Sequence, residues 1–150
     1  MKNSSFYSSL IFLSFFSLLS IFTTADAGLT NDILQQTNSF RRSRGLPVLI
    51  MNEDLNAIAQ KHSLNMAKSR IGFGHGGVNK RDAEATRKLK GTSRFAENVA
   101  YGPTSGKEVV DMWKRSPGHR KNILGRFKYI GIGIAKDRKG RIYYTQLFAG

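Results

Sequence analysis

Three side chains of this sequence could together bind a metal ion or activate a water molecule. His75 lies among glycines in residues 71–78, where the backbone can place an imidazole at the edge of a cleft. Glu97 lies in an otherwise apolar run, where a carboxylate needs a charged or hydrogen-bonding partner. His119 falls in the first turn of a short expected helix, a position that lowers the pKa of a histidine and favours its neutral form. Two imidazoles and one carboxylate suit Zn²⁺ or another divalent cation with an open coordination position.

Each of these residues also has a purely structural interpretation. His75 could be a surface loop residue, Glu97 could form a structural salt bridge to one of the many basic residues, and His119 could be an exposed imidazole. His62 differs, because it lies on the apolar face of a helix and is expected to be a core histidine outside the site. The sequence has no cysteine and no Gly-x-Ser-x-Gly motif, which excludes a thiol nucleophile and disfavours a serine hydrolase.

The elements that would carry these residues are mostly helices, followed by two strands. Helices are expected from a Thr30 or Asn31 cap to Gly45, after an Asn52 cap, over residues 81–90, after a Ser105–Glu108 capping box, and from Pro117 to Gly125. Residues 71–78 contain too many glycines for a helix and are expected to form a loop. Residues 129–135 and 142–148 are rich in β-branched and aromatic residues, and the turn signal at 137–140 predicts a hairpin.

The first strand of this hairpin has two different faces. Ile130, Ile132 and Ile134 share one face, while Gly131 and Gly133 lie on the other, where a helix could approach closely. Trp113 is expected in the core beside the isoleucine face. Helices first and strands last predict an α+β domain built in layers.

The charge of the chain and its N-terminal segment indicate where the protein is located and which partners it could bind. The 150-residue chain carries a net charge of +14, with dense basic stretches at 41–44, 87–90 and 136–139. Such a charge attracts polyanions, although it could also serve solubility alone. Residues 1–27 have the layout of a secretory signal peptide that ends in Ala25-Asp26-Ala27, and an uncleaved membrane anchor is the alternative. The mature chain, residues 28–150, is then expected outside the cytoplasm, with no further transmembrane span; this location disfavours nucleic acid as its partner.

Four segments resemble the CAP superfamily, which includes cysteine-rich secretory proteins, venom allergens and pathogenesis-related proteins. These segments are residues 96–102, 113–124, 129–135 and 143–148, and the resemblance extends over 31–148. The absence of cysteine makes the chain similar to the SCP-type extracellular domains of bacteria. The resemblance implies a three-layer α-β-α sandwich of CAP type over residues 28–150.

The resemblance also implies a cleft in which two histidines and two glutamates can hold a divalent metal. By position, His75, Glu97 and His119 match three of these four residues. The second glutamate normally follows the helix tryptophan by three residues, but Ser116 stands at that position here. Glu108 and Asp111 are the candidate replacements. One carboxylate fewer weakens the attraction for a cation, so zinc binding is expected to be weak.

Two functions agree with these observations. The first is a secreted, non-catalytic binding module that uses the His/Glu cleft and the basic surface to bind an anionic or lipid-like extracellular partner, such as a membrane or cell-wall component. The second is a metal-dependent, peptidase-like hydrolase in which His75 and His119 hold the cation and Glu97 acts as ligand or general base. Members of the CAP superfamily include sterol or lipid binders, defence proteins, venom components and proteases, so fold alone does not select between the two functions.

Overall fold

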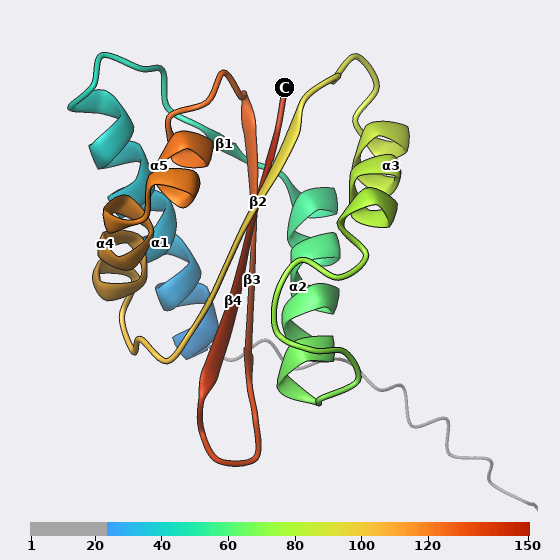
Figure 1. The fold of residues 1–150 in the computed structure, drawn as a ribbon. Helices are drawn as coiled ribbons and strands as arrows, with labels where there is room; N and C mark the ends of the chain where they lie inside the picture. Colours follow the sequence, from blue (N-terminus) through green and yellow to red (C-terminus); the bar gives the residue numbers. More distant parts are fainter. Residues whose placement is uncertain (1–23) are drawn as a thin grey trace, which may run out of the picture.

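The computed structural model describes residues 24–150, which form three layers (Figure 1). One layer contains helices α1 (Thr24–Arg42), α4 (Gly106–Arg115) and α5 (Pro117–Ile123), and the opposite layer contains α2 (Glu53–Ala67) and α3 (Val78–Lys88). Between them lies a four-stranded sheet in the order β1 (Ile50–Met51), β3 (Tyr129–Lys136), β4 (Ile142–Ala149) and β2 (Phe95–Tyr101). Strand β1 is parallel to β3, and the other neighbours are antiparallel. The predicted α+β sandwich is confirmed.

The helix caps that the sequence predicts are present at α2 and α4. The side chain of Asn52 accepts a hydrogen bond from the backbone N–H of Leu55 at 3.0 Å. Ser105 and Glu108 form the reciprocal capping box, and Pro117 occupies the start of α5. Each cap satisfies backbone donors that the first turn of a helix leaves unpaired.

The predicted start of the first helix is wrong. Helix α1 begins at Thr24 rather than at a Thr30 or Asn31 cap. The hydroxyl of Thr30 donates to the carbonyl of Asp26 at 2.9 Å, four residues earlier, so Thr30 lies inside the helix. Good helix formers such as Ala27 and Leu29 precede it and extend the helix. Residues 1–23 of the predicted signal peptide lie outside the described residues, and residues 24–27 form the first turn of α1.

Three other elements differ from the sequence prediction. Helix α3 spans Val78–Lys88 instead of residues 81–90. Strands β1 and β2 carry no clear strand signal in the sequence: β1 has two residues, and β2 has the polar pair Glu97-Asn98 at its centre. Both are stabilised by pairing with the hairpin strands, β1 with β3 and β2 with β4.

The two faces of β3 build two separate cores. Ile130, Ile132 and Ile134 pack in one cluster with Trp113, whose indole N–H donates to the carbonyl of Val99 at 3.2 Å. On the other face, a Cβ placed on Gly133 would overlap backbone atoms of Ala59 in α2. The predicted burial of Trp113 and the predicted close helix approach are both confirmed. Within residues 24–150, no helix is long and apolar enough to cross a membrane.

The contact between α2 and β3 leads to a stability prediction. Gly133→Ala should lower the free energy of unfolding by about 1–3 kcal/mol, because the new methyl group must displace the α2 backbone. Gly118→Ala is the matched control: its Cβ would meet nothing within 4 Å, so stability should be unchanged or slightly higher. Urea unfolding followed by Trp113 fluorescence measures both, and equal stability of the two variants would contradict the close approach.

Candidate functional site

The carboxylate of Glu97 is the centre of the candidate site. It projects from edge strand β2 towards the α2–α3 layer, and its side chain is 1% exposed. An unpaired carboxylate at such a position would cost several kcal/mol, so a partner is required. Arg81 of α3 is that partner: its Nε lies 2.5 Å from Oε2 and its Nη2 lies 2.8 Å from Oε1. This two-point pairing matches the planar fork of a guanidinium to a carboxylate.

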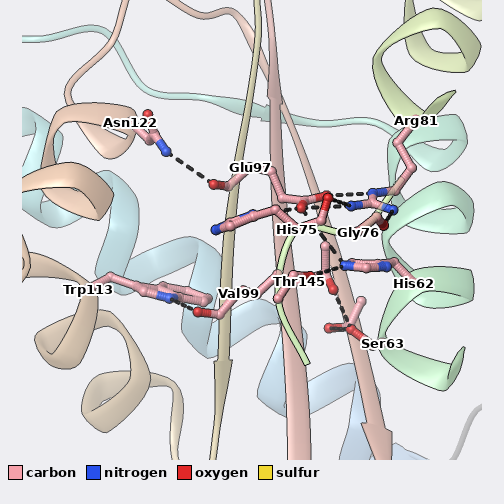
Figure 2. A network of polar contacts seen from close by, with 12 residues as sticks. His62, Ser63, His75, Gly76, Arg81, Glu97, Val99, Trp113, Asn122 and Thr145 are labelled. Carbon is pink, nitrogen blue, oxygen red and sulfur yellow. Dashed lines mark hydrogen bonds and ion pairs between the residues drawn. The ribbon is translucent and has the colours of Figure 1, made fainter. Parts of the chain in front are cut away.

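The same guanidinium holds the glycine-rich loop. Its Nη1 donates to the carbonyl of Gly76 at 2.8 Å. His75 in this loop lies with Nδ1 2.9 Å from Oε1 of Glu97. Because a carboxylate only accepts, Nδ1–H is the donor, and Nε2 lies on the side away from Glu97 (Figure 2). Glu97 and Arg81 therefore fix the position and the orientation of His75.

His62 belongs to this cluster, and the prediction that it lies outside is wrong. It is buried on α2, as predicted, but its Nε2 lies 3.8 Å from Oε1 of Glu97. The same nitrogen donates to the carbonyl of Gly74 at 2.9 Å, so His62 also anchors the glycine-rich loop. The helical spacing identified the buried face, but the distance to Glu97 depends on how β2 packs beside α2.

Burial lowers the pKa of His62. The loss of solvent is the largest cause, and the positive charge of Arg81 lowers the pKa further. The carboxylate of Glu97 and the hydrogen bond to Gly74 act in the opposite direction without reversing the shift. His62 is therefore neutral in the folded protein near pH 7.

His119 reaches the site from the opposite helical layer. Its backbone carbonyl accepts from Asn98 of β2 at 3.2 Å, and Asn122 of α5 donates to the carbonyl of Glu97 at 3.1 Å. These amides hold α5 against β2. The pKa of His119 is lowered first by burial and then by the charge of His75. The sequence predicts a lowered pKa for His119, and the structure agrees in direction. The leading cause, however, is burial of the imidazole and not its position at a helix N-terminus.

His75 and His119 line one pocket of about 560 Å³ that spans the edge of β2. The rest of its wall is mainly apolar and includes Phe73, Tyr101 and Met112. Phe73 packs edge-to-face on Tyr101, with ring centroids 4.8 Å apart. Glu97 contacts His75 through Nδ1 of the imidazole, and it does not line the pocket. The structure thus places two of the three predicted residues at the pocket and the third beneath it.

The residues present do not fit a metal centre. Both oxygens of Glu97 already accept hydrogen bonds from Arg81, whose positive charge would repel a cation. Glu108 and Asp111, the candidate replacements for the second glutamate, are not in the pocket: Glu108 caps α4, and Asp111 pairs with Lys107 and Lys114. In residues 24–150, no three acidic or histidine side chains are placed to share a metal ion.

The pocket also has few groups for covalent chemistry. Its wall within the described residues contains no serine or threonine hydroxyl, which disfavours a serine- or threonine-type nucleophile. The imidazoles of His75 and His119 can form hydrogen bonds with a ligand. The arrangement is suited to binding a molecule with an apolar body and a polar group.

Several residues of the site were not predicted from the sequence. Arg81 is one of 24 lysines and arginines, and nothing in its local sequence marks it. Phe73 stands between two glycines, and Met112 lies beside the buried Trp113 without being buried itself. A large apolar residue in a flexible or exposed setting is a usable signal of a binding surface.

The comparisons with known proteins agree with this architecture. The model of the cysteine-rich secretory protein family, CAP, matches residues 34–148. The Bacillus subtilis protein YkwD is 36% identical over 121 residues, covering 79% of this chain and 46% of YkwD. The chain therefore spans less than half the length of this relative.

Solved structures give the same result for the fold. An extracellular SCP-domain protein of Bacillus anthracis superposes with a TM-score of 0.69 and 28% identity, covering 81% of this chain and 40% of that one. A cysteine-rich secretory protein of Staphylococcus aureus gives a TM-score of 0.66 at 23% identity, covering 82% and 38%. The second likeness, at this low identity, concerns the fold alone.

Removal of the arginine should test the role of the buried ion pair. Arg81→Met should lower the free energy of unfolding by about 3–5 kcal/mol, because it leaves the carboxylate of Glu97 buried without its main partner. Lys88→Met is the matched control on the same helix; its pair with Asp54 is 2.8 Å long but largely exposed, so the loss should stay below about 1 kcal/mol. Urea unfolding at pH 7 measures both, and equal losses would contradict the assigned role.

The lowered pKa of His62 predicts acid sensitivity. Unfolding raises this pKa to its ordinary value, so the unfolded chain binds a proton that the folded chain rejects. The stability is present above pH 6.5 and is lost as the pH falls, by at most about 1.4 kcal/mol per pH unit for one proton. His62→Gln keeps a donor for Gly74 and should flatten this dependence between pH 7 and 5. Urea unfolding across that range is the measurement, and an unchanged slope would exclude His62 as its source.

Proposed function

This chain belongs to the cysteine-rich secretory protein (CAP) family, and we propose that it is a secreted, non-catalytic binding module. Its pocket beside β2 takes a lipid-like molecule, meaning one with an apolar body and a small polar group. The family contains many activities on one fold, so the proposal depends on the side chains of this pocket and not on the fold.

The observation that carries the proposal is a concentration of exposed apolar surface. Five large hydrophobic side chains are exposed in residues 24–150, and three of them line this one pocket. Phe73 is 51% exposed, Tyr101 is 44% exposed and Met112 is 37% exposed. Apolar surface gathered in a concave site is typical of a ligand site. A flexible methionine beside aromatic rings can adapt to an irregular hydrocarbon shape.

The two histidines provide the polar side of the pocket. His75 is oriented by Glu97 so that Nε2 is directed away from the carboxylate, and its side chain is 49% exposed. His119 lines the same pocket, and its lowered pKa favours the neutral form. A hydroxyl or protonated carboxyl group of a ligand could bind between the two rings, while its apolar part contacts the aromatic wall.

The pocket favours binding over hydrolysis. The metal-dependent hydrolase considered from the sequence needs Glu97 as a ligand or general base. Glu97 is held by Arg81 and His75, and it has no place in the pocket wall. A rigid ion pair of this kind supports the loop that carries His75 but leaves no carboxylate to activate water.

The proposed location outside the cytoplasm is supported by two observations. The sequence begins with an apolar segment followed by a small-x-small motif at residues 25–27, which is typical of signal peptides. The Bacillus anthracis protein of similar structure is described as extracellular. Cleavage after Ala27 would remove the first turn of α1 and leave every residue of the pocket in the mature chain.

Binding of a fluorescent fatty acid tests the proposed function. Wild-type protein should bind cis-parinaric acid saturably, with one site per chain. Phe73→Ala should weaken this binding by about tenfold, because the hydrocarbon loses an aromatic contact surface. Ile50→Ala is the matched control, since Ile50 is 52% exposed and lies outside the pocket. Absence of binding to the wild type, or equal losses in the two variants, would refute the proposal.

A further inference from the structure

A second pocket, which shares no residue with the cleft, has a different chemistry. It measures about 740 Å³ and lies between the end of α2 and the tip of the β3–β4 hairpin, which are at the same end of the sandwich (Figure 1). We call it the basic pocket, and define it by its charged residues, which are Lys68, Arg70, Lys136, Asp137, Arg138 and Lys139. None of these residues lines the pocket of His75 and His119.

The basic pocket has a strong excess of positive charge. Five of its six charged residues are cations, and all five are exposed. Within residues 24–150, none of these five forms an ion pair. Cations gathered in a concave surface with an excess over carboxylates raise the local concentration of anions.

The single carboxylate of the pocket is already used by the hairpin turn. Oδ1 of Asp137 accepts the backbone N–H groups of Lys139 and Arg141, at 2.8 and 2.9 Å. The amide of Gly140 closes the turn by donating to the carbonyl of Asp137 at 3.0 Å. Asp137 therefore shapes the turn that presents Arg138 and Lys139, and its hydrogen bonds leave it a weak competitor for these cations.

The other wall of the pocket is also held by backbone geometry. At the end of α2, the N–H of Arg70 donates to the carbonyl of Asn65 at 2.9 Å, and the N–H of Ser69 donates to Met66 at 3.0 Å. This pattern ends the helix with a residue in the left-handed region, here Ser69 with φ of 53°. Glycine is usual at this position. Both cationic segments are thus placed by hydrogen-bonded turns before any ligand arrives, which reduces the entropy lost on binding.

From these features we infer that the basic pocket binds a multivalent phosphate group, held by Lys68, Arg70, Lys136, Arg138 and Lys139. Arginine and lysine together suit this ligand, because guanidinium groups pair with two phosphate oxygens and ammonium groups act as point charges. The size of the pocket admits several linked phosphates rather than one. The inference does not depend on the proposed cleft function, since the two pockets share no residue.

A membrane surface is the other anionic partner that this charge could serve. Proteins that lie on membranes combine basic residues with exposed apolar side chains that enter the lipid. The basic pocket has no such side chain: the exposed large hydrophobic residues of the described chain, such as Ile50 and Phe73, all lie outside it. The concave shape likewise favours a small multivalent anion that enters the pocket over a flat bilayer.

Two triple variants of identical net charge test the inference. The pocket variant is Arg70→Ser, Arg138→Ser and Lys139→Ser. The control variant is Arg87→Ser, Lys90→Ser and Lys121→Ser, whose three residues are exposed and outside the pocket. Each lowers the formal charge from +14 to +11, by removing three cations. Equal melting temperatures of both variants and wild type, expected for exposed positions, establish that binding differences do not come from unfolding.

Isothermal titration with sodium tripolyphosphate at 50 and 150 mM NaCl is the measurement. We expect one site per wild-type chain, about tenfold or greater weakening in the pocket variant, and a change below about twofold in the control variant. Phe73→Ala should bind tripolyphosphate as the wild type does, which separates this site from the cleft. Equal weakening of tripolyphosphate binding in both triple variants would mean that net charge alone drives the binding, and it would overturn the inference. So would absence of tripolyphosphate binding, including the case in which wild type binds only vesicles of phosphatidylglycerol.

Discussion

The buried carboxylate of Glu97 is the constraint on which the site depends. A charge on an edge strand with 1% exposure must be neutralised within the protein. Arg81 does this from α3, and the same guanidinium also binds the loop at Gly76. His62 anchors that loop from α2. Neutralising one carboxylate thus joins β2, two helices and the glycine-rich loop, and it orients His75 at the pocket. The ion pair that builds the site is also what removes Glu97 from metal chemistry.

The sheet determines where a pocket can form. Glycines on one face of β3 let α2 approach the sheet closely, while the isoleucine face packs against the layer of Trp113. This leaves β2 as an edge strand between the two helical layers (Figure 1). His75 arrives at that edge from one layer and His119 from the other, held by Asn98. The pocket therefore forms at an edge strand that neither helical layer fully covers. A bound ligand would shield its apolar side chains from water.

The two pockets divide the chemistry of the molecule. The cleft beside β2 is mainly apolar with two imidazoles, whereas the basic pocket is cationic and polar. A net charge of +14 would by itself attract anions to any part of the surface. What distinguishes the basic pocket is that five cations without ion pairs gather around one concavity, while Lys107 and Lys114 of α4 share Asp111. Within residues 24–150, other cations without ion pairs, such as Arg87 and Lys121, lie outside this pocket, so position as well as pairing decides which cations can bind one ligand together.

The sequence by itself determined the layered α+β fold, the caps at Asn52 and Ser105, the hairpin and the burial of Trp113. These features depend on residues close together in the chain, or on periodicity along one element, so local pattern is sufficient. It also singled out His75, Glu97 and His119. Only the tertiary structure decided that Arg81 neutralises Glu97, that His62 joins the cluster, and that Lys68 faces the hairpin 68 residues later. Such pairings arise between segments that are distant in sequence, and their energy depends on burial and distance, which no local pattern contains.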